Sequence, residues 1–375
     1  MRIVHAKVFI GKKFQEGGIE FDEKIMDVFS GERCGKLTSE DIDAEGMYLI
    51  PGLIDIHTHG AVGIDVCEAE NEELRKLSEY YAWDGVTSWC PTTATVTEKV
   101  LVNAMHRFRD FVRPENGAKI AAVNMEGPFL SRSRAGAMNL SALRVPNKEM
   151  FFRLQKESGG IVKIVSVAPE LDGASDFIRE VSGSAAVALG HTDADYETAK
   201  RAFCDGASHI THLFNCIPGI AHRNPGPIPA AIEEGATVEL ITDGYHVHPS
   251  VIRLAFRLFG DRVVLISDSL TCAGFEDGEY FMSGNEITVL NGKATLKGRE
   301  TLAGSSIHLM EGLRRSVRFG IPLEEAVYAA TRAPSVVIGC DDRIGSISPG
   351  KEADLVLLDS ELRVKEVFIC GKQIR

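Results

Sequence analysis

Two histidines separated by one residue, His57 and His59, end an apolar run in the segment PGLIDIHTHG at residues 51–60. Alternate side chains of a β-strand point to the same side, so these imidazoles would face together, about 7 Å apart along the chain. Neutral imidazole is a common ligand of divalent metal ions. Two histidines on a half-exposed strand give the same pattern without a metal, so the pair indicates a metal site only if further ligands converge on it.

Further imidazoles and carboxylates stand directly after other short apolar segments. They are Glu126 after IAAVNM, His191 after AAVALG, His212 after SHIT and Asp268 after VVLIS. Four imidazoles and two carboxylates suit a borderline divalent metal such as Zn²⁺ or Fe²⁺, bound through nitrogen and oxygen with a position left for water. Chance is a poor explanation for six such residues at segment ends, so we predict that they form one metal site.

The apolar segments before these residues alternate with helical patterns from about residue 52 onward. Eight of them are typical of strands: GLIDIHTH, VTSWCPTT, IAAVNMEG, VKIVSVAPE, AAVALGH, SHITHLF, TVELITDG and RVVLISDS. Apolar residues recur between them at helical spacing, at Leu74, Leu77 and Tyr81 and again at Val251, Leu254, Ala255 and Leu258. Eight such units predict a closed parallel (β/α)8 barrel, whose active site lies at the C-terminal ends of the strands. That fold would bring the candidate ligands to one mouth.

An open, doubly wound sheet is the competing architecture. It usually has fewer strands and a Gly-rich phosphate fingerprint after the first, and GAVGIDV at residues 60–66 does not match GxGxxG. The barrel is therefore favoured.

The two ends of the chain differ from its middle. Residues 1–50 contain short strand patterns without helical ones, and strand patterns return after about residue 345 in GKEADLVLLD and VKEVFICGKQI. We predict that residues 1–50 and 346–375 form one small β-sandwich domain and that residues 51–345 form the catalytic barrel.

Charge and hydropathy limit the partners of the chain. The formal net charge of the 375 residues is −12, with no long basic run, which argues against nucleic-acid binding. No apolar run approaches the roughly 20 residues needed to cross a bilayer. The first residues, MRIVHAKVFIG, lack the features of a signal peptide, so a cytoplasmic protein without membrane contact is expected.

Other histidines lie near the predicted mouth. His246 and His248 follow the seventh strand, so at least one of them is expected to be catalytic or to bind substrate. His222 lies beside Arg223 in the segment IAHRNPGP, where a surface position and a substrate contact fit equally well.

Several motifs carry a resemblance to a known family. EGPFL, THLFN, DGYHV and LAGSS, together with PGLIDIHTHG and ALGHTDA, occur in this order over nearly the whole chain. The chain thereby resembles the N-acetylglucosamine-6-phosphate deacetylases of the amidohydrolase superfamily. The resemblance implies a metal-bearing (β/α)8 barrel with a small β-sandwich built from both termini.

The same resemblance implies roles for individual residues. Glu126, His191 and His212 would hold one metal ion, and His57 and His59 would allow a second ion bridged by Glu126, with Asp268 close by. The metal would be Zn²⁺ or Fe²⁺. The residues implied to bind substrate are Ala137, Met138, Asn215, Cys216, Arg223, Asp243, Gly244, Tyr245, His246, Leu302, Ala303 and Gly304.

The implied substrate is a small amino-sugar phosphate. Asn215 and Cys216 would meet its phosphate, joined by Arg223 from the partner subunit of a homodimer, because a guanidinium can donate two parallel hydrogen bonds to a phosphate. A metal would lower the pKa of water toward about 7. Asp268 would take the proton of that water and return it to the leaving amine, while His246 and the metal stabilise the oxyanion.

The chain departs from the family at two positions. Gly136-Ala137-Met138 replaces a sequence that commonly ends in histidine, and a thioether cannot donate a hydrogen bond. Met138 therefore leaves the choice between the glucosamine and galactosamine epimers open. Cys216 stands in THLFNCI where the family usually has THLFNAM, a small change if the backbone makes the contact.

Other functions remain as alternatives. Dihydroorotase and hydantoinase relatives commonly bridge two metals with a carboxylated lysine at the end of strand 4, whereas Lys163 lies at the start of that segment and Pro169-Glu170 at its end. A metal-dependent dipeptidase would show no preference for a 6-phosphate. A non-catalytic sugar-phosphate binding protein would have lost the general base, yet Asp268 is present.

Overall fold

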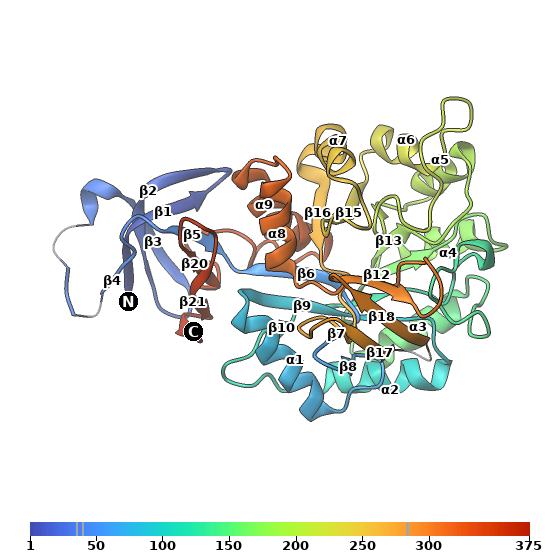
Figure 1. Ribbon diagram of the computed structural model, residues 1–375, viewed down its shortest axis with the longest axis horizontal. Coiled ribbons are helices and arrows are strands. Elements are labelled where there is room, and N and C mark those ends of the chain that lie inside the picture. Colours follow the sequence, from blue (N-terminus) through green and yellow to red (C-terminus); the bar gives the residue numbers. More distant parts are fainter. Residues whose placement is uncertain (35–36, 40, 283–284) are drawn as a thin grey trace.

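Parallel strands form the centre of the molecule (Figure 1). The computed structural model describes residues 1–34, 37–39, 41–282 and 285–375. Within them the barrel strands are β6 (Leu53–Thr58), β9 (Val86–Thr93), β11 (Val123–Met125), β12 (Val162–Val167), β13 (Ala186–Leu189), β14 (His209–Ile210), β15 (Thr237–Ile241) and β16 (Val263–Ile266). Each strand pairs in parallel with its neighbour in this order, and β10 (Lys119–Ile120) joins β9. The predicted barrel is confirmed, because each of the eight predicted segments contributes a strand.

The first and last barrel strands meet at the mouth. Thr58 and Ser269 form a parallel bridge. The backbone N–H of Asp268 donates to the carbonyl of His57 at 2.9 Å, and the N–H of His59 donates to the carbonyl of Ser269 at 2.9 Å. Closure of the barrel thus sets Asp268 beside the histidine pair, although about two hundred residues separate them in the chain.

Helices cover the outside of the barrel. They are α1 (Asn71–Trp83), α2 (Glu98–Arg109), α3 (Lys148–Glu157), α4 (Ala174–Val181), α5 (Tyr196–Cys204), α6 (Pro227–Glu233), α7 (Pro249–Phe259), α8 (Leu309–Arg318), α9 (Leu323–Ala330) and α10 (Arg332–Val337). The apolar face predicted for α1 is confirmed, since Leu74, Leu77 and Tyr81 are buried.

The face predicted for α7 is confirmed in part, because Ala255 is buried and the partly buried Val251 and Leu258 pack against the core. The buried residues of this helix are Ile252, Ala255, Phe256 and Phe259, whereas Leu254 is exposed. The inward face is centred on Phe256 and Phe259, because burying these two rings removes more apolar surface from water than burying Leu254 would.

Strands from both termini build a separate sheet. Its strands are β1 (Arg2–Ile10), β2 (Lys13–Phe21), β3 (Ile25–Ser30), β4 (Asp41–Asp43), β5 (Tyr48–Pro51), β20 (Leu355–Leu358), β21 (Val364–Ile369) and β22 (Lys372–Gln373). The pairing of β5 with β20 joins the two ends of the chain. Buried apolar residues such as Ile19, Leu49 and Phe368 form its core. The predicted terminal β domain is confirmed, and its limits at residues 50 and 346 stay a prediction.

Short antiparallel strands extend the barrel on the mouth side. After β6, β7 (Gly60–Ala61) pairs with β8 (Ile64–Asp65). Between β16 and α8, β17 (Gly278–Met282), β18 (Asn285–Leu290) and β19 (Lys293–Leu296) form a three-stranded sheet. The hydroxyl of Tyr245, in the loop after β15, donates to the carbonyl of Asn291 at 2.6 Å. The small sheet therefore contacts a loop at the carboxyl end of the barrel.

In the described part of the chain, no helix combines the length and apolar character that crossing a membrane requires.

Candidate active site

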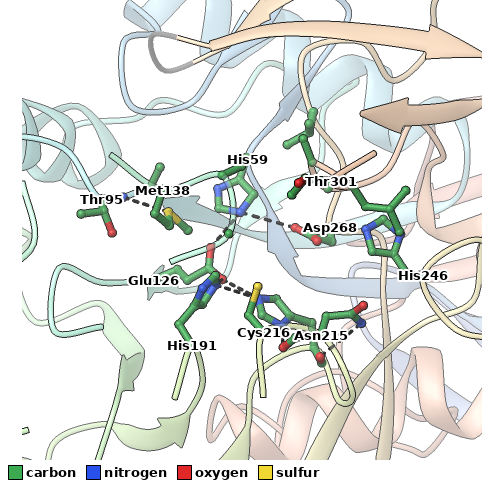
Figure 2. A pocket seen from close by; sticks show the side chains of 18 of the residues that line it. His59, Thr95, Glu126, Met138, His191, Asn215, Cys216, His246, Asp268 and Thr301 are labelled. Carbon is green, nitrogen blue, oxygen red and sulfur yellow. Dashed lines mark hydrogen bonds and ion pairs between the residues drawn. The ribbon is translucent and has the colours of Figure 1, made fainter. Parts of the chain in front are cut away.

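A cavity of about 320 Å³ opens at the mouth of the barrel (Figure 2). Many residues singled out from the sequence line it: His59, Glu126, Ala137, Met138, His191, His212, Asn215, Cys216, His246, Asp268, Leu302, Ala303 and Gly304. The structure therefore brings together side chains from loops after six different barrel strands, as expected for this fold.

Glu126 lies between two pairs of histidines. Its Oε1 is 3.0 Å from Nε2 of His191 and 2.7 Å from Nε2 of His212. Its Oε2 is 3.0 Å from Nε2 of His59 and 3.5 Å from Nε2 of His57. Each carboxylate oxygen thus faces one pair, and the two groups that could hold a metal ion share Glu126.

The outward-facing nitrogens of the four histidines all have acceptors. Nδ1 of His59 donates to the carbonyl of Thr92 at 3.0 Å, and Nδ1 of His191 donates to the carbonyl of Arg134 at 2.8 Å. Nδ1 of His212 lies 3.2 Å from the Asn215 carbonyl. Nδ1 of His57 lies 2.8 Å from Oε2 of Glu239. These acceptors hold a proton on every Nδ1 and leave the Nε2 atoms as ligands.

The inward-facing atoms fit a cation. Nε2 of His191 and Nε2 of His212 are 3.1 Å apart. Among the described side chains, Nε2 of His57 and Oε2 of Glu126 are buried and have no hydrogen-bond partner. Lone pairs that face one another in a buried site are costly unless protons or a cation lie between them. Nitrogen and carboxylate donors in this arrangement suit a divalent metal ion.

The pKa shifts of His59 and Glu126 also indicate a site for a cation. Burial lowers the pKa of His59, but the carboxylates of Asp268 and Glu126 outweigh it and raise that pKa to about 9. Burial raises the pKa of Glu126, yet the neighbouring histidines, His57 foremost, hold it well below its ordinary value. The site is therefore built to keep positive charge next to an ionised Glu126.

Backbone strain is concentrated at the same residues. His191, His212 and Asp268 have φ angles of 49°, 23° and 48°, in the left-handed region that side chains with a Cβ rarely adopt. Such conformations persist only where surrounding structure enforces them, and they gather at functional sites. Hydrogen bonds to these residues are thus part of what positions the site.

Asp268 and His246 lie at the wall of the cavity. Oδ1 of Asp268 is 3.4 Å from Nε2 of His59. Burial raises the pKa of Asp268, but His59 and His57 lower it overall, so the carboxylate is ionised. Nδ1 of His246 donates to Oδ2 of Asp243 at 2.7 Å. His248, the other candidate in this loop, is exposed and caps α7 by accepting from Ser250.

Some predicted substrate residues lie away from this cavity. Arg223 is exposed in the segment 219–226, and its Nη1 is 2.6 Å from Nε2 of His222. Asp243 positions His246 rather than lining the cavity, and Tyr245 is 41% exposed. Gly244 has a φ of 80° in the same turn. Within one chain, therefore, none of these four residues lines the cavity.

Sequence reasoning missed several residues of the site. Thr95 and Thr301 line the cavity, and the backbone N–H of Thr95 lies 3.4 Å from Sδ of Met138. Thr95 follows the second strand, so the same strand-end rule could have found it. Glu239 was missed because it lies within the apolar segment TVELI, where nothing in the pattern separates it from an ordinary strand residue.

The end of the fourth strand bears no lysine. β12 ends at Val167, and Lys163 lies near its beginning. Glu170 accepts hydrogen bonds from the Thr192 hydroxyl and from the backbone N–H of Asp193 at 2.7 Å. The carboxylate between the histidine pairs comes from Glu126 instead.

Comparisons with known proteins agree with this geometry. Residues 48–374 match the amidohydrolase family. The chain is 37% identical over 352 residues to an N-acetylglucosamine-6-phosphate deacetylase of Bacillus subtilis (strain 168), covering 92% of this chain and 88% of that protein. It is 34% identical to an N-acetylgalactosamine-6-phosphate deacetylase of Escherichia coli O157:H7, with 88% of each covered.

A solved structure is similar over the full length. It is a mutant N-acetyl-D-glucosamine-6-phosphate deacetylase from Mycobacterium smegmatis in complex with N-acetyl-D-glucosamine-6-phosphate, with a TM-score of 0.93 and 29% identity, covering 100% of this chain and 99% of that one. The chain therefore belongs to the amidohydrolase family, and within it to the N-acetylglucosamine-6-phosphate deacetylases.

Proposed function

We propose that this protein hydrolyses the acetamide of N-acetylglucosamine 6-phosphate to glucosamine 6-phosphate and acetate, as part of amino-sugar breakdown. The observation that carries the proposal is Glu126 between two histidine pairs, with Asp268 at the wall of the same cavity. The names of the relatives and the substrate bound to the similar M. smegmatis enzyme support it.

The proposed cofactor is one or two divalent ions, with zinc or iron expected. Glu126, His191 and His212 would hold one ion, and His57 and His59 would hold a second through Glu126. Such an ion lowers the pKa of a coordinated water toward about 7 and polarises a carbonyl oxygen.

Asp268 is the proposed general base and then acid. Its ionised carboxylate can accept a proton from water at the start of the reaction and give it to the amine that leaves, so one side chain serves both steps. The backbone N–H of Asp268 donates to the carbonyl of His57 at 2.9 Å and its carbonyl accepts from the N–H of Ser305 at 2.7 Å, so its position at the mouth is fixed from both sides.

His246 is proposed to stabilise the negative charge that forms on the acetyl oxygen. Its Nδ1–H is used by Asp243, so Nε2 can donate only from the charged imidazolium. Burial lowers the pKa of His246, but Asp243 raises it overall, which favours that charged form near neutral pH.

The phosphate is proposed to meet donors of two subunits. Asn215 and Cys216 lie at the cavity, whereas Arg223 is exposed outside it in the same chain. In a homodimer, Arg223 of one subunit would reach the cavity of the other and join Asn215 and Cys216 there, which would explain why it lies outside the cavity of its own chain. The guanidinium would supply two parallel charge-assisted hydrogen bonds.

N-acetylgalactosamine 6-phosphate is the second candidate substrate. Met138, rather than a hydrogen-bonding side chain, lines the cavity next to Thr95. A thioether cannot donate to a sugar hydroxyl, so this wall gives no strong discrimination between the epimers at C4.

The test is release of acetate from four sugars: the two N-acetylhexosamine 6-phosphates and the same sugars without phosphate. Elemental analysis of the purified protein identifies the metal. We expect turnover of N-acetylglucosamine 6-phosphate at least about a hundredfold faster than of the free sugar, because the phosphate contacts orient the substrate. Equal rates on the phosphorylated and free sugars would refute the phosphate site, and no acetate from any of the four would refute the function.

A further inference from the structure

A buried carboxylate below the cavity contacts both histidine pairs. Glu239 lies on β15 inside the barrel and is 0% exposed. Its Oε2 is 2.8 Å from Nδ1 of His57 and 3.0 Å from the backbone nitrogen of His212. Its Oε1 is 3.2 Å from Nε2 of His209. Glu239 does not line the cavity, so it is placed to act on substrate only through other residues.

For His57 this contact fixes the protonation of the ring. A carboxylate accepts but does not donate, so Nδ1 of His57 carries the proton and Nε2 keeps its lone pair. That Nε2 lies 3.5 Å from Oε2 of Glu126. His57 is 0% exposed, so water cannot replace the contact with Glu239.

For His212 the contact fixes the backbone. The φ of His212 is 23°, which is strained for a residue with a Cβ. The side chain of Glu239 accepts from the N–H of His212, and the carbonyl of Glu239 accepts from the N–H of Leu213 at 2.8 Å. One residue thus holds the peptide units on both sides of His212 in the geometry that points Nε2 at Glu126.

We infer that Glu239 is a positioning residue for the whole metal centre, because it orients one histidine from each of the two groups. The inference rests on the metal centre of the proposed function and not on the sugar substrate. A carboxylate buried in a strand without polar partners is costly, and the partners of Glu239 are nitrogens of His57, His209 and His212.

The test compares variants that change either the position of the Glu239 side-chain oxygens or their charge, but not both. Glu239→Gln keeps an oxygen at the same position without the charge, and Glu239→Asp keeps the charge but withdraws the oxygen by one methylene. Val238→Ala is the control, because Val238 is the adjacent buried residue of β15 and its side chain packs in the apolar core. Affinity for Zn²⁺ is measured by competition with a chromophoric chelator, the ligand field by the visible spectrum of the Co²⁺ form, and folding by circular dichroism without metal.

We expect Glu239→Asp to bind Zn²⁺ about 10- to 100-fold more weakly than the natural chain and to shift the Co²⁺ spectrum. Losses of this size are typical when a metal-binding histidine loses the hydrogen-bond acceptor that orients it. Glu239→Gln should retain most of the affinity, and Val238→Ala should bind normally even if it is less stable.

Normal Zn²⁺ affinity in Glu239→Asp, or an equal loss in Val238→Ala, would overturn the inference. If Glu239→Asp does not fold, Glu239→Gln decides. A Zn²⁺ affinity close to that of the natural chain would support positioning by the oxygen atoms, whereas an affinity as low as that of a His57→Ala variant would overturn it. A natural chain that binds no Zn²⁺ would overturn the metal centre itself, which the acetate assay tests separately.

Discussion

At the scale of single residues, the central feature is that Glu126 uses its two oxygens for different histidine pairs. The strand-end rule found these residues because their positions follow from the topology of a barrel. It could not find Glu239, since a polar residue in the middle of a strand becomes meaningful only when the strands on either side are known.

Replacing Asp268 by asparagine should separate chemistry from metal binding. Asparagine keeps an oxygen near His59 but cannot take up a proton, so we expect kcat to fall at least about a hundredfold with unchanged metal content. The measurement is steady-state acetate release together with elemental analysis. Near-normal turnover in Asp268→Asn would contradict the role of Asp268 as general base.

Replacing His59 by asparagine tests the pairing of the histidines. His59 contacts Oε2 of Glu126 and has no part in the group of His191 and His212. We therefore expect His59→Asn to bind one ion fewer at saturating Zn²⁺, while Glu126→Gln weakens binding in both groups. Equilibrium dialysis with elemental analysis gives the stoichiometry. An unchanged ion count in His59→Asn would mean that His57 and His59 hold no ion.

At the scale of elements, the strands were easier to predict than what joins them. Eight apolar segments and their order were sufficient for the barrel. The β17–β19 sheet was not predicted, although NEITVL and KATL alternate on either side of Asn291-Gly292, a pattern typical of a hairpin. The face of α7 was predicted only in part, with Leu254 exposed instead of buried, because apolar residues on several sides of the helix leave its orientation to packing. Local patterns define elements, whereas the choice among similar faces depends on neighbours distant in sequence.

One ion cluster connects the barrel to the terminal sheet. Nζ of Lys119, next to β9, contacts the carboxylates of Glu352 and of Asp354, the latter at 2.5 Å, and the Asp354 side chain is 3% exposed. Burial raises the pKa of Glu352, but Lys119 lowers it overall. The stabilisation from Glu352 is therefore present above its ordinary pKa and is lost as the pH falls through the lower folded-state pKa.

Lys119→Met should destabilise the protein by about 2 kcal/mol at pH 7, because the buried Asp354 loses its ion pair and Glu352 keeps only the contact with Arg343. Without Lys119 the pKa of Glu352 rises, so in the variant this carboxylate is protonated at a higher pH than in the natural chain. We expect the difference from the natural chain to shrink between pH 7 and pH 4, measured by urea unfolding. Lys148→Met is the control, since the exposed Lys148–Glu180 pair is screened by water and should contribute much less. A difference that does not change with pH would contradict this account.

At the scale of the whole molecule, the position of Arg223 predicts cooperation between subunits. Arg223→Met should raise KM for the phosphorylated sugar at least about tenfold, because a charge-assisted contact is lost, and should leave the rate on the free sugar unchanged.

Mixing two impaired variants, assayed at a phosphorylated-sugar concentration well below the raised KM, tests whether Arg223 acts across the dimer. Arg223→Met and Asp268→Asn subunits, mixed in equal amounts and allowed to exchange, would form mixed dimers with one intact site each. About a quarter of all sites would then be active by random pairing. Recovery of activity is expected, and no recovery despite subunit exchange would place Arg223 at its own cavity or outside any site.

The barrel and the terminal sheet could be predicted because the periods of their strands and helices are regular. The shared set of candidate metal ligands could be predicted because barrel closure brings the strand ends together. The most direct measurement of that centre is anomalous diffraction at the zinc edge from crystals grown with Zn²⁺. We predict a peak about 2.1 Å from Nε2 of His191 and of His212 and close to Oε1 of Glu126. An empty map at this position, with the three side chains turned to separate partners, would contradict the account.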